Sequence, residues 1–409
     1  MSEKNKQFTR YLAKDIQRMI KKNNSILLFG PRQVGKTTLV SNALSSISNK
    51  AEYYLQNPMI RRELEVNPSK IIDQVSAYEK APYVFIDEAQ KVPEIFDAAQ
   101  FLIDDRKARF IFTGSSARKL RRAGTNLLPG RVVRYFLDPL SWGELGLIKQ
   151  SNVRGLEVDN INPPASFTFK DSLVFGSLPA IASLKQPERG LFLKSYADIY
   201  LEEEIRAEAI SRKIGAFGKF LELAAAESGT APNLTKLSQE ALVSQPAIKE
   251  FYRILEDTLI VERVEPYVKS ARKRILSSPR YYFFDLGVRN ALARLPLSPD
   301  LINAQKGVLF EHAVMLEIIR RTRLLHKDYR VHFWRTQHGL EVDCVIDMGD
   351  EIVPIEIKAS RSVSLSDIRG LRTFLEDYKK NAKRGYVITM GERKEKLAEN
   401  IIALPWNEI

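Results

Sequence analysis

The residues with the clearest chemical signature form one run near the start of the chain, Gly30-Pro31-Arg32-Gln33-Val34-Gly35-Lys36-Thr37. The run fits G-x-x-x-x-G-K-[ST], the phosphate-binding P-loop. Its two glycines let the backbone curl so that several N–H groups point at one anion. We expect Lys36 to reach the β- and γ-phosphates of ATP and the Thr37 hydroxyl to bind Mg²⁺. With Thr38, the run forms the predicted nucleotide-binding set.

The elements that this motif requires flank it on both sides. The apolar run Ile26–Phe29 predicts a buried parallel strand, and Thr38–Leu44 predicts a helix. The start of a helix carries a partial positive charge, which adds to the attraction for phosphate. A glycine-rich turn that resembles a P-loop by chance would lack these neighbours.

Two further strands end in polar residues. Tyr83–Glu88 is a Walker B pattern, in which Asp87 would hold Mg²⁺ and Glu88 would orient and deprotonate the attacking water. The strand Arg109–Phe112 leads into Thr113, whose hydroxyl could sense the γ-phosphate or could serve an ordinary turn. The three strands, with helices between them, predict a parallel αβα sheet that binds ligands at its carboxyl edge.

These motifs, together with Leu128-Pro129-Gly130-Arg131 and Pro139-Leu140-Ser141-Trp142-Gly143-Glu144, resemble those of bacterial and archaeal AAA-type ATPases with a DUF4143 C-terminal region. The resemblance covers nearly the whole chain. It implies an α/β protein with a P-loop αβα ATPase domain, a helical and winged-helix middle, and an α/β nuclease-like C-terminal domain. We expect these domains to occupy residues 1–150, 151–290 and 291–409.

The segment Arg118–Arg134 contains six basic residues and no acidic one. The resemblance makes Arg131 the candidate for an arginine finger, which stabilises transition-state charge on the nucleotide of a neighbouring subunit. A solvated basic loop and a contact with nucleic-acid phosphate are the alternatives. A finger acting between subunits requires a homo-oligomer, and AAA-type proteins form rings or spirals, so a hexamer is one expected size.

Residues 216–285 predict a winged-helix unit, in which three helices precede a two-stranded hairpin. The expected elements are Phe217–Ala226, Leu234–Leu242, Ala247–Asp257, Leu259–Val264 and Arg280–Asp285. The third helix places Lys249, Tyr252 and Arg253 on or near one polar face. The loop of the hairpin adds four basic residues, Lys269, Arg272, Lys273 and Arg274. Such a unit could grip duplex DNA, or it could serve only as a lid or packing module.

The second chemical signature is a predicted hairpin, Leu340–Asp347 with Ile352–Ala359, that turns at Gly349-Asp350. This register sets Asp343 opposite Glu356 and Glu341 opposite Lys358, all on one face. The other face is predicted to be apolar and consists of Val342, Cys344, Ile346, Val353, Ile355 and Ile357.

Opposed carboxylates repel each other, and a divalent cation would compensate them. Oxygen ligands suit Mg²⁺ or Mn²⁺, with Lys358 positioned to orient water or stabilise developing charge. Asp343 followed by Glu356-x-Lys358 resembles the PD-(D/E)xK nucleases, and Glu311 on an upstream helix matches the extra acid of many such enzymes. The alternatives are a solvated charged face and a nuclease fold without cleavage activity.

The composition of the chain limits which partners and which cellular compartment we expect. The net charge of +13 favours a polyanionic partner such as DNA. The single cysteine, Cys344, excludes an internal disulfide framework and suits the reducing cytoplasm. No stretch is long and apolar enough to span a bilayer, so we expect no membrane partner.

The leading hypothesis is an ATP-binding and ATP-hydrolysing AAA-type protein that acts on DNA, with a Mg²⁺-dependent nuclease-like domain. The alternative is an ATP-dependent regulatory or signalling switch whose C-terminal domain is a non-catalytic interaction module. The complete set of Glu311, Asp343, Glu356 and Lys358 favours the DNA hypothesis, because a switch without DNA chemistry has no need of all four.

Overall fold

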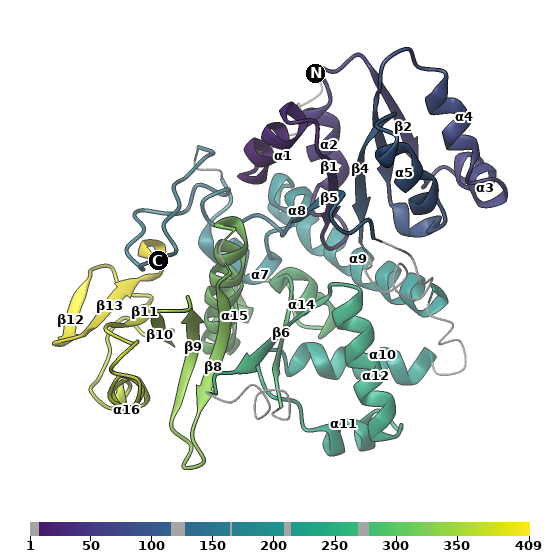
Figure 1. Cartoon of the computed structure of the whole chain (residues 1–409). Helices are drawn as coiled ribbons and strands as arrows, with labels where there is room; N and C mark the ends of the chain where they lie inside the picture. The colour runs from purple at the N-terminus through teal and green to yellow at the C-terminus, as the bar shows by residue number, and fades with distance from the viewer. Residues whose placement is uncertain (1–7, 116–126, 164–165, 208–213, 269–277, 327) are drawn as a thin grey trace. The chain divides into compact units, whose positions relative to one another are not determined.

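A computed structural model describes residues 8–115, 127–163, 166–207, 214–268, 278–326 and 328–409. The chain divides into two compact units (Figure 1). The first contains Thr9–Pro139 and Arg253–Ile260, and the second contains Leu140–Tyr252 and Val261–Ile409. Each unit has its own sheet and its own apolar core.

The first unit is built on a five-stranded sheet with the order β2-β3-β4-β1-β5. Its strands are β1 (Ser25–Phe29), β2 (Lys50–Tyr54), β3 (Tyr83–Asp87), β4 (Arg109–Gly114) and β5 (Val132–Phe136). All four strand pairs are parallel. The carboxyl ends of the strands therefore share one edge of the sheet, and the predicted parallel sheet is confirmed.

Helices cover both faces of this sheet. They are α1 (Leu12–Lys21), α2 (Lys36–Ala43), α3 (Pro58–Val66), α4 (Lys70–Ser76), α5 (Ile95–Asp104) and the 3₁₀ turn η1 (Ala89–Lys91). One face packs against α5, where the Phe96 and Phe112 rings stack 4.7 Å apart. The alternate strand residues Ile26, Phe85 and Ile111 face the other way and are fully buried as well. Burial on both faces is typical of a parallel sheet.

The second unit contains an eight-stranded mixed sheet with the order β12-β13-β11-β10-β9-β8-β6-β7. Its strands are β6 (Val261–Pro266), β7 (Arg280–Phe283), β8 (Arg330–Arg335), β9 (Glu341–Asp347), β10 (Ile352–Lys358), β11 (Gly385–Thr389), β12 (Glu395–Ala398) and β13 (Ile401–Pro405). The hairpin predicted to carry the acidic residues is β9–β10, in the middle of the sheet.

The helices of the second unit are α7 (Phe169–Phe175), α8 (Pro179–Ser183), α9 (Gln186–Ala207), α10 (Ile214–Ala226), α11 (Leu234–Glu240), α14 (Leu286–Leu292), α15 (Asp300–Leu324), α16 (Arg369–Asp377) and the terminal 3₁₀ turn η3 (Trp406–Glu408). The helix α12 (Gln245–Asp257) begins in the second unit, and its last residues, from Arg253, belong to the first. The long helix α15 packs on one face of the sheet and α16 on the other (Figure 1). The central hairpin is thus covered on both sides.

The helices and strands predicted for the winged helix form close to the expected positions as α10, α11, α12, β6 and β7. The hairpin is not isolated, however, because β6 also pairs in parallel with β8 and so continues the C-terminal sheet. Tyr252 does not lie on a polar surface as predicted, since it is 4% exposed and its ring stacks on Tyr281 at 4.3 Å. The basic residues between β6 and β7, Lys269 to Arg274, lie outside the described residues. The winged-helix assignment stays a prediction.

Among the described residues, none of the helices has both the length and the apolar character needed to cross a membrane.

Candidate nucleotide site and C-terminal acidic cluster

The P-loop connects β1 to α2 at the carboxyl edge of the first sheet. Its backbone turns through positive φ angles at Gln33 (62°) and Gly35 (91°). Gly30 is required for a different reason: a Cβ atom there would lie 2.2 Å from the carbonyl oxygen of Leu137. The Leu137 N–H in turn donates to the carbonyl of Phe29 at 2.8 Å. The two glycines therefore permit a tight loop whose N–H groups can face an anion.

Lys36 is 5% exposed and its ammonium group bonds back to the loop. Nζ donates to the carbonyl oxygens of Gly30 at 2.9 Å and Pro31 at 2.7 Å. Burial lowers the pKa of Lys36 to about 8, against the opposing pull of the Glu88 and Asp87 carboxylates. A cation held this way can exchange carbonyl partners for phosphate oxygens without moving far.

The Walker B aspartate accepts hydrogen bonds from the first turn of α2 and from the end of β4. Because β4 lies between β1 and β3, the end of β4 stands beside Asp87. Asp87 Oδ1 accepts from the hydroxyls of Thr37 at 2.8 Å and Thr113 at 2.6 Å. Thr113 Oγ1 also accepts from the Glu88 N–H at 3.0 Å. Thr113 thus orients the two acids, and its contact with the γ-phosphate stays a prediction.

Glu88 is held in a defined orientation at the end of β3. Its backbone is left-handed, with φ 57° and ψ 46°. Its Oε2 atom accepts from the Ser115 hydroxyl at 3.0 Å and from the Gln90 side-chain amide. Gln90 also donates to Ser115 at 3.1 Å, so three side chains form a closed triangle. A non-glycine residue in this conformation carries backbone strain, which is common where a side chain must point in one direction.

The remaining predicted loop residues surround the same turn. Pro31 and Val34 are buried, Arg32 and Gly35 are partly exposed, and Gln33 and Thr38 are exposed. The carbonyl of Val34 accepts from Arg10 at 2.7 Å. The positive charge of Arg32 contributes to the lowered pKa of Lys36. The whole set from Gly30 to Thr38 therefore forms one loop and the first turn of α2.

Arg131 lies at the amino edge of the sheet, whereas the P-loop lies at the carboxyl edge. It precedes β5, whose first residue, Val132, pairs with the first residue of β1, Ser25. Its guanidinium forms a bidentate ion pair with Asp104, in which Nε donates to Oδ1 at 2.7 Å and Nη2 donates to Oδ2 at 2.9 Å. This contact raises the pKa of Arg131 and lowers that of Asp104. Arg131 therefore cannot serve the nucleotide loop of its own subunit from this position. The basic residues 118–122 lie outside the described residues.

The donor set at the P-loop suits Mg²⁺. The Thr37 hydroxyl and the Asp87 carboxylate supply two oxygens 2.8 Å apart, close enough to be neighbouring ligands of one ion. Mg²⁺ in nucleotide sites is commonly held by one or two protein oxygens, with phosphate and water as the other ligands. Thr37 and Asp87 therefore fit the ion in number and in chemistry.

The predicted register of the C-terminal hairpin is confirmed. The pairs Ile352↔Asp347 and Ile355↔Cys344 fix the alignment of β9 and β10. One step further along the same alignment sets Asp343 opposite Glu356. The Met348 N–H donates to the Glu351 carbonyl at 2.9 Å and closes the turn.

Asp343 and Glu356 are buried, at 8% and 6% exposure. Asp343 Oδ2 accepts from the Ile357 N–H at 2.8 Å, and Glu356 Oε1 accepts from Lys358 Nζ at 2.7 Å. Glu356 Oε2 is buried and has no hydrogen-bond partner in the described part of the chain. The alternative of a solvated charged face is therefore wrong for these two residues, because both side chains are buried.

A second half of the cluster gathers around Arg280 at the start of β7. Arg280 is 7% exposed and forms an ion pair with Glu341. A Glu311 oxygen lies 3.9 Å from its Nη1 atom and accepts from the Tyr282 hydroxyl at 3.3 Å. The guanidinium also lies over the Phe333 ring, 4.4 Å from its centre. Arg280 thus compensates part of the acidic charge from within the sheet.

The pKa values of the acids follow from burial and crowding. Burial, and then the Asp343 charge, raises the pKa of Glu356 to about 8 and that of Glu311 to about 7. About a third of the Glu311 side chain (32%) stays exposed, so water also reaches this carboxylate. Burial also raises the pKa of Asp343, although Lys358 opposes the change. The cluster therefore favours a bound proton or cation.

The cluster fits a metal ion only in part. In the described ranges, no three acidic, histidine or cysteine side chains gather closely enough to hold a metal. Asp343 and Glu356 offer suitable oxygens, including the unpartnered Glu356 Oε2. Glu311 is engaged by Tyr282 and lies near Arg280, so it is not positioned as a third ligand.

One residue of the predicted apolar face lies on the other side. β9 has a register shift against β8, where His332 pairs with Val345 but Trp334 pairs with Val342. The irregularity reverses the alternation of side chains between the two faces of the sheet. Val342 therefore packs with Trp334 and α16, and not with Cys344 and α15. A β-bulge of this kind leaves little trace in a sequence pattern.

Comparison with protein families identifies three segments. Residues 22–146 match the family model described as an AAA domain, and residues 306–409 match DUF4143, a domain of unknown function. A segment similar to AAA domains thus precedes a segment similar to DUF4143 in this chain. Between them, residues 166–299 match DUF8612, another domain of unknown function.

Two relatives align with nearly the whole chain at low identity. An uncharacterized protein of Mycobacterium tuberculosis is 24% identical over 403 residues, which is 97% of this chain and 83% of the relative. An uncharacterized protein of Methanocaldococcus jannaschii is 23% identical over 425 residues, covering 94% of this chain and 84% of the relative. Among solved structures, the Walker-type ATPase of Pyrococcus abyssi is 15% identical with a TM-score of 0.45, covering 69% of this chain and 96% of that one.

Three residues that contact the sites were not singled out from the sequence. In the first unit, Arg10 donates to the carbonyl of Val34 in the P-loop and Gln90 donates to Glu88. Near the DUF4143 domain, Arg280 neutralises the acids. Gln90 had a local signal, because it follows the Walker B acids by two residues. The other two meet their partners only through long-range folding, so no spacing in the sequence reveals them.

Proposed function

We propose that this chain is an ATP-binding and ATP-hydrolysing AAA-type protein that acts on DNA. One observation supports the ATPase part of the proposal. Asp87 accepts hydrogen bonds from the hydroxyl groups of Thr37 in the P-loop and Thr113 in β4. This contact brings the phosphate loop, the metal-binding acid and the catalytic acid to one sheet edge. The AAA-domain match over residues 22–146 supports the same assignment.

The residues have separate roles in this proposal. Lys36 exchanges its carbonyl partners for the β- and γ-phosphates, and the loop N–H groups bind the same oxygens. Thr37 and Asp87 hold Mg²⁺, which would neutralise charge on the phosphates. Glu88 orients and deprotonates the attacking water, and its bonds to Ser115 and Gln90 fix where the carboxylate stands.

Arg131 is proposed to act on the nucleotide of a neighbouring subunit. Its position at the sheet edge away from its own P-loop supports a role between subunits. Asp104 keeps the guanidinium charged and oriented. The proposal therefore includes a homo-oligomer, of which a hexamer is one size. The division at residues 150 and 290 and the cytoplasmic location belong to the same proposal.

DNA is the proposed partner because the chain carries a net charge of +13. A Mg²⁺- or Mn²⁺-dependent nuclease-like site in the C-terminal domain is the finer part of this proposal. The buried pair of Asp343 and Glu356 supports it, with Lys358 2.7 Å from Glu356. In this role the two carboxylates would bind the ion, and Lys358 would orient water or stabilise developing charge.

A second candidate is an ATP-dependent regulatory switch whose C-terminal domain is a non-catalytic interaction module. The observation that favours it is Arg280, whose guanidinium pairs with Glu341 and lies 3.9 Å from Glu311. An acidic cluster compensated in this way can be stable and serve only to hold the fold.

Calorimetry of ATP binding tests the first step of the proposal. Lys36→Ala should abolish measurable ATP binding by the full chain, because the loop loses its one lysine contact to the phosphates. Lys22→Ala, which removes an exposed lysine away from the loop, should bind ATP like the wild type. Equal ATP affinity of the wild type and Lys36→Ala would overturn the P-loop assignment.

A further inference from the structure

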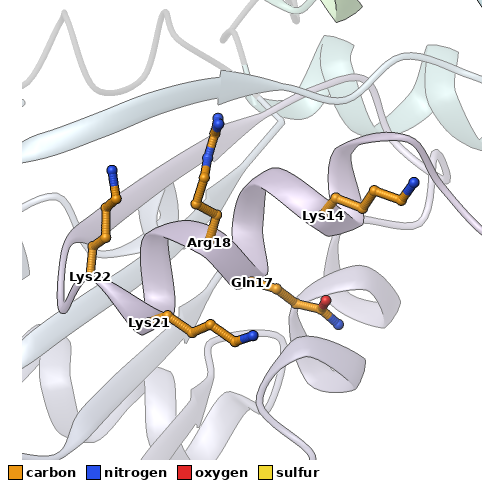
Figure 2. A pocket seen from close by; sticks show the side chains of 5 residues that line it. All are labelled: Lys14, Gln17, Arg18, Lys21 and Lys22. Carbon is orange, nitrogen blue, oxygen red and sulfur yellow. The ribbon is translucent and has the colours of Figure 1, made fainter.

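The exposed side of α1 is strongly basic. Its exposed residues, together with the residue that follows the helix, are Lys14, Gln17, Arg18, Lys21 and Lys22. At 100° per residue these five fall within about 140° of the helix circumference. They surround a shallow hollow of about 310 Å³, and Figure 2 shows their side chains projecting from the helix. We call these five residues the basic face of α1.

The charge on this face is nearly of one sign. Asp15 is the one acidic residue of α1, and it pairs with Arg18 at 2.5 Å. Lys14, Lys21 and Lys22 add three more positive charges within about 12 Å of helix. Duplex DNA carries one phosphate charge per about 1.7 Å of its axis, so a stretch of this length meets several phosphates.

The opposite side of α1 is buried in the apolar core. Leu12, Ile16 and Ile20 are at most 9% exposed. A helix that lies on a membrane inserts its apolar side into lipid. Because α1 has no such side available, its basic face suits a polyanion that is bound through charge alone, and this favours nucleic-acid phosphate over a lipid surface.

Hydrogen bonds connect both ends of α1 to elements of the candidate nucleotide site. Arg10, two residues before the helix, donates to the carbonyls of Val34 in the P-loop at 2.7 Å and Asp138 at 2.6 Å. At the other end, the hydroxyl of Tyr83 donates to the Ile20 carbonyl at 2.7 Å, and Tyr83 begins the Walker B strand. A displacement of α1 therefore acts on both the P-loop and the strand that carries Asp87.

We propose that the basic face of α1 is a docking surface for the phosphate backbone of nucleic acid, and that docking there changes ATP turnover through Arg10 and Tyr83. This inference rests on the proposed action on DNA and assigns one surface to it. It requires no sequence specificity, because phosphate contacts are the same along any duplex.

Binding of a fluorescent DNA duplex to the full chain, measured by anisotropy over a series of salt concentrations, tests the surface. The test variant is Lys14→Ala/Lys21→Ala/Lys22→Ala. The matched control is Arg62→Ala/Lys70→Ala/Lys80→Ala, which removes three exposed positive charges from the same unit but beside other helices. The slope of log affinity against log salt should fall by about three in the test variant, at about 0.9 per lost phosphate contact. The control should keep the wild-type slope.

The ATP turnover rate with and without duplex is the second readout. Duplex should change the rate of the wild type and the control, and should leave the rate of the test variant unchanged. Equal ATP affinity without DNA for all three proteins shows that the substitutions leave the fold intact.

The outcomes separate this inference from the function it rests on. Salt-dependent DNA binding that is the same in the test variant and the control overturns the docking surface alone. No DNA binding by the wild type overturns the DNA action together with the docking surface. Binding to vesicles of phosphatidylcholine and phosphatidylserine, lost in the test variant, with no DNA binding, would identify the surface as a lipid site and contradict the proposal.

Discussion

At the scale of single residues, we expect the ionisation of Lys36 to control phosphate binding by the P-loop. Burial lowers its pKa from 10.5 to about 8, so the free protein loses this positive charge within an accessible pH range. ATP should therefore bind with constant affinity below about pH 7.5 and more weakly above pH 8. With a pKa near 8, the affinity should fall about fivefold between pH 8 and pH 9. Calorimetry at fixed Mg²⁺ measures this, and a flat profile to pH 9.5 would show that Lys36 stays charged or makes no phosphate contact.

The acids of the C-terminal hairpin can be tested by single substitutions. Asp343→Ala should remove Mn²⁺ binding and any Mn²⁺-dependent cleavage of DNA, because the site loses one of its two carboxylates. Asp347→Ala is the matched control, since Asp347 lies on the same strand but caps the turn by accepting from the Gly349 N–H at 3.0 Å. Persistence of both Mn²⁺ binding and cleavage in Asp343→Ala would refute the metal site and favour the non-catalytic module.

At the scale of elements, the approach of β5 and its following residues to the P-loop sets the shape of the loop. Gly30→Ala places a Cβ atom 2.2 Å from the Leu137 carbonyl oxygen, so the strand or the loop must shift. We expect a loss of about 1–3 kcal/mol in unfolding free energy together with weaker ATP binding. Gly307→Ala, where no atom lies within 4 Å, should cost nothing. Urea unfolding of both variants measures the difference, and equal stability would mean that the loop adapts without strain.

The elements predicted from the sequence are those whose signals are local. The P-loop, the Walker B strand and the hairpin register each follow from spacing within about twenty residues, and the pairs from Asp347 with Ile352 to Cys344 with Ile355 form as expected. The β-bulge that turns Val342 to the other face depends on pairing with β8, which the hairpin pattern does not contain. The burial of Tyr252 has the same origin, because its partner Tyr281 comes from a different element. Arg10 and Arg280 are similar cases, since each meets its acceptors only after the chain has folded.

At the scale of the whole molecule, a finger between subunits predicts complementation. Arg131→Ala should bind ATP normally but hydrolyse it about 10³-fold more slowly, as in other phosphoryl-transfer enzymes that lose such an arginine. Mixing Arg131→Ala with Lys36→Ala chains should restore part of the turnover, because one variant supplies an intact P-loop and the other an intact finger. Turnover in the mixture that equals the sum of the separate variants would contradict the role of Arg131 between subunits.

The central claim is that the AAA domain hydrolyses ATP with Glu88 as its base. The most direct measurement is the rate of phosphate release from ATP by the purified full chain and by Glu88→Gln, at ATP concentrations that saturate both. The account predicts turnover by the wild type, and ATP binding with turnover at least about 10²-fold lower in Glu88→Gln, because the amide cannot accept the proton of the attacking water. Equal rates of phosphate release from the two proteins would contradict it.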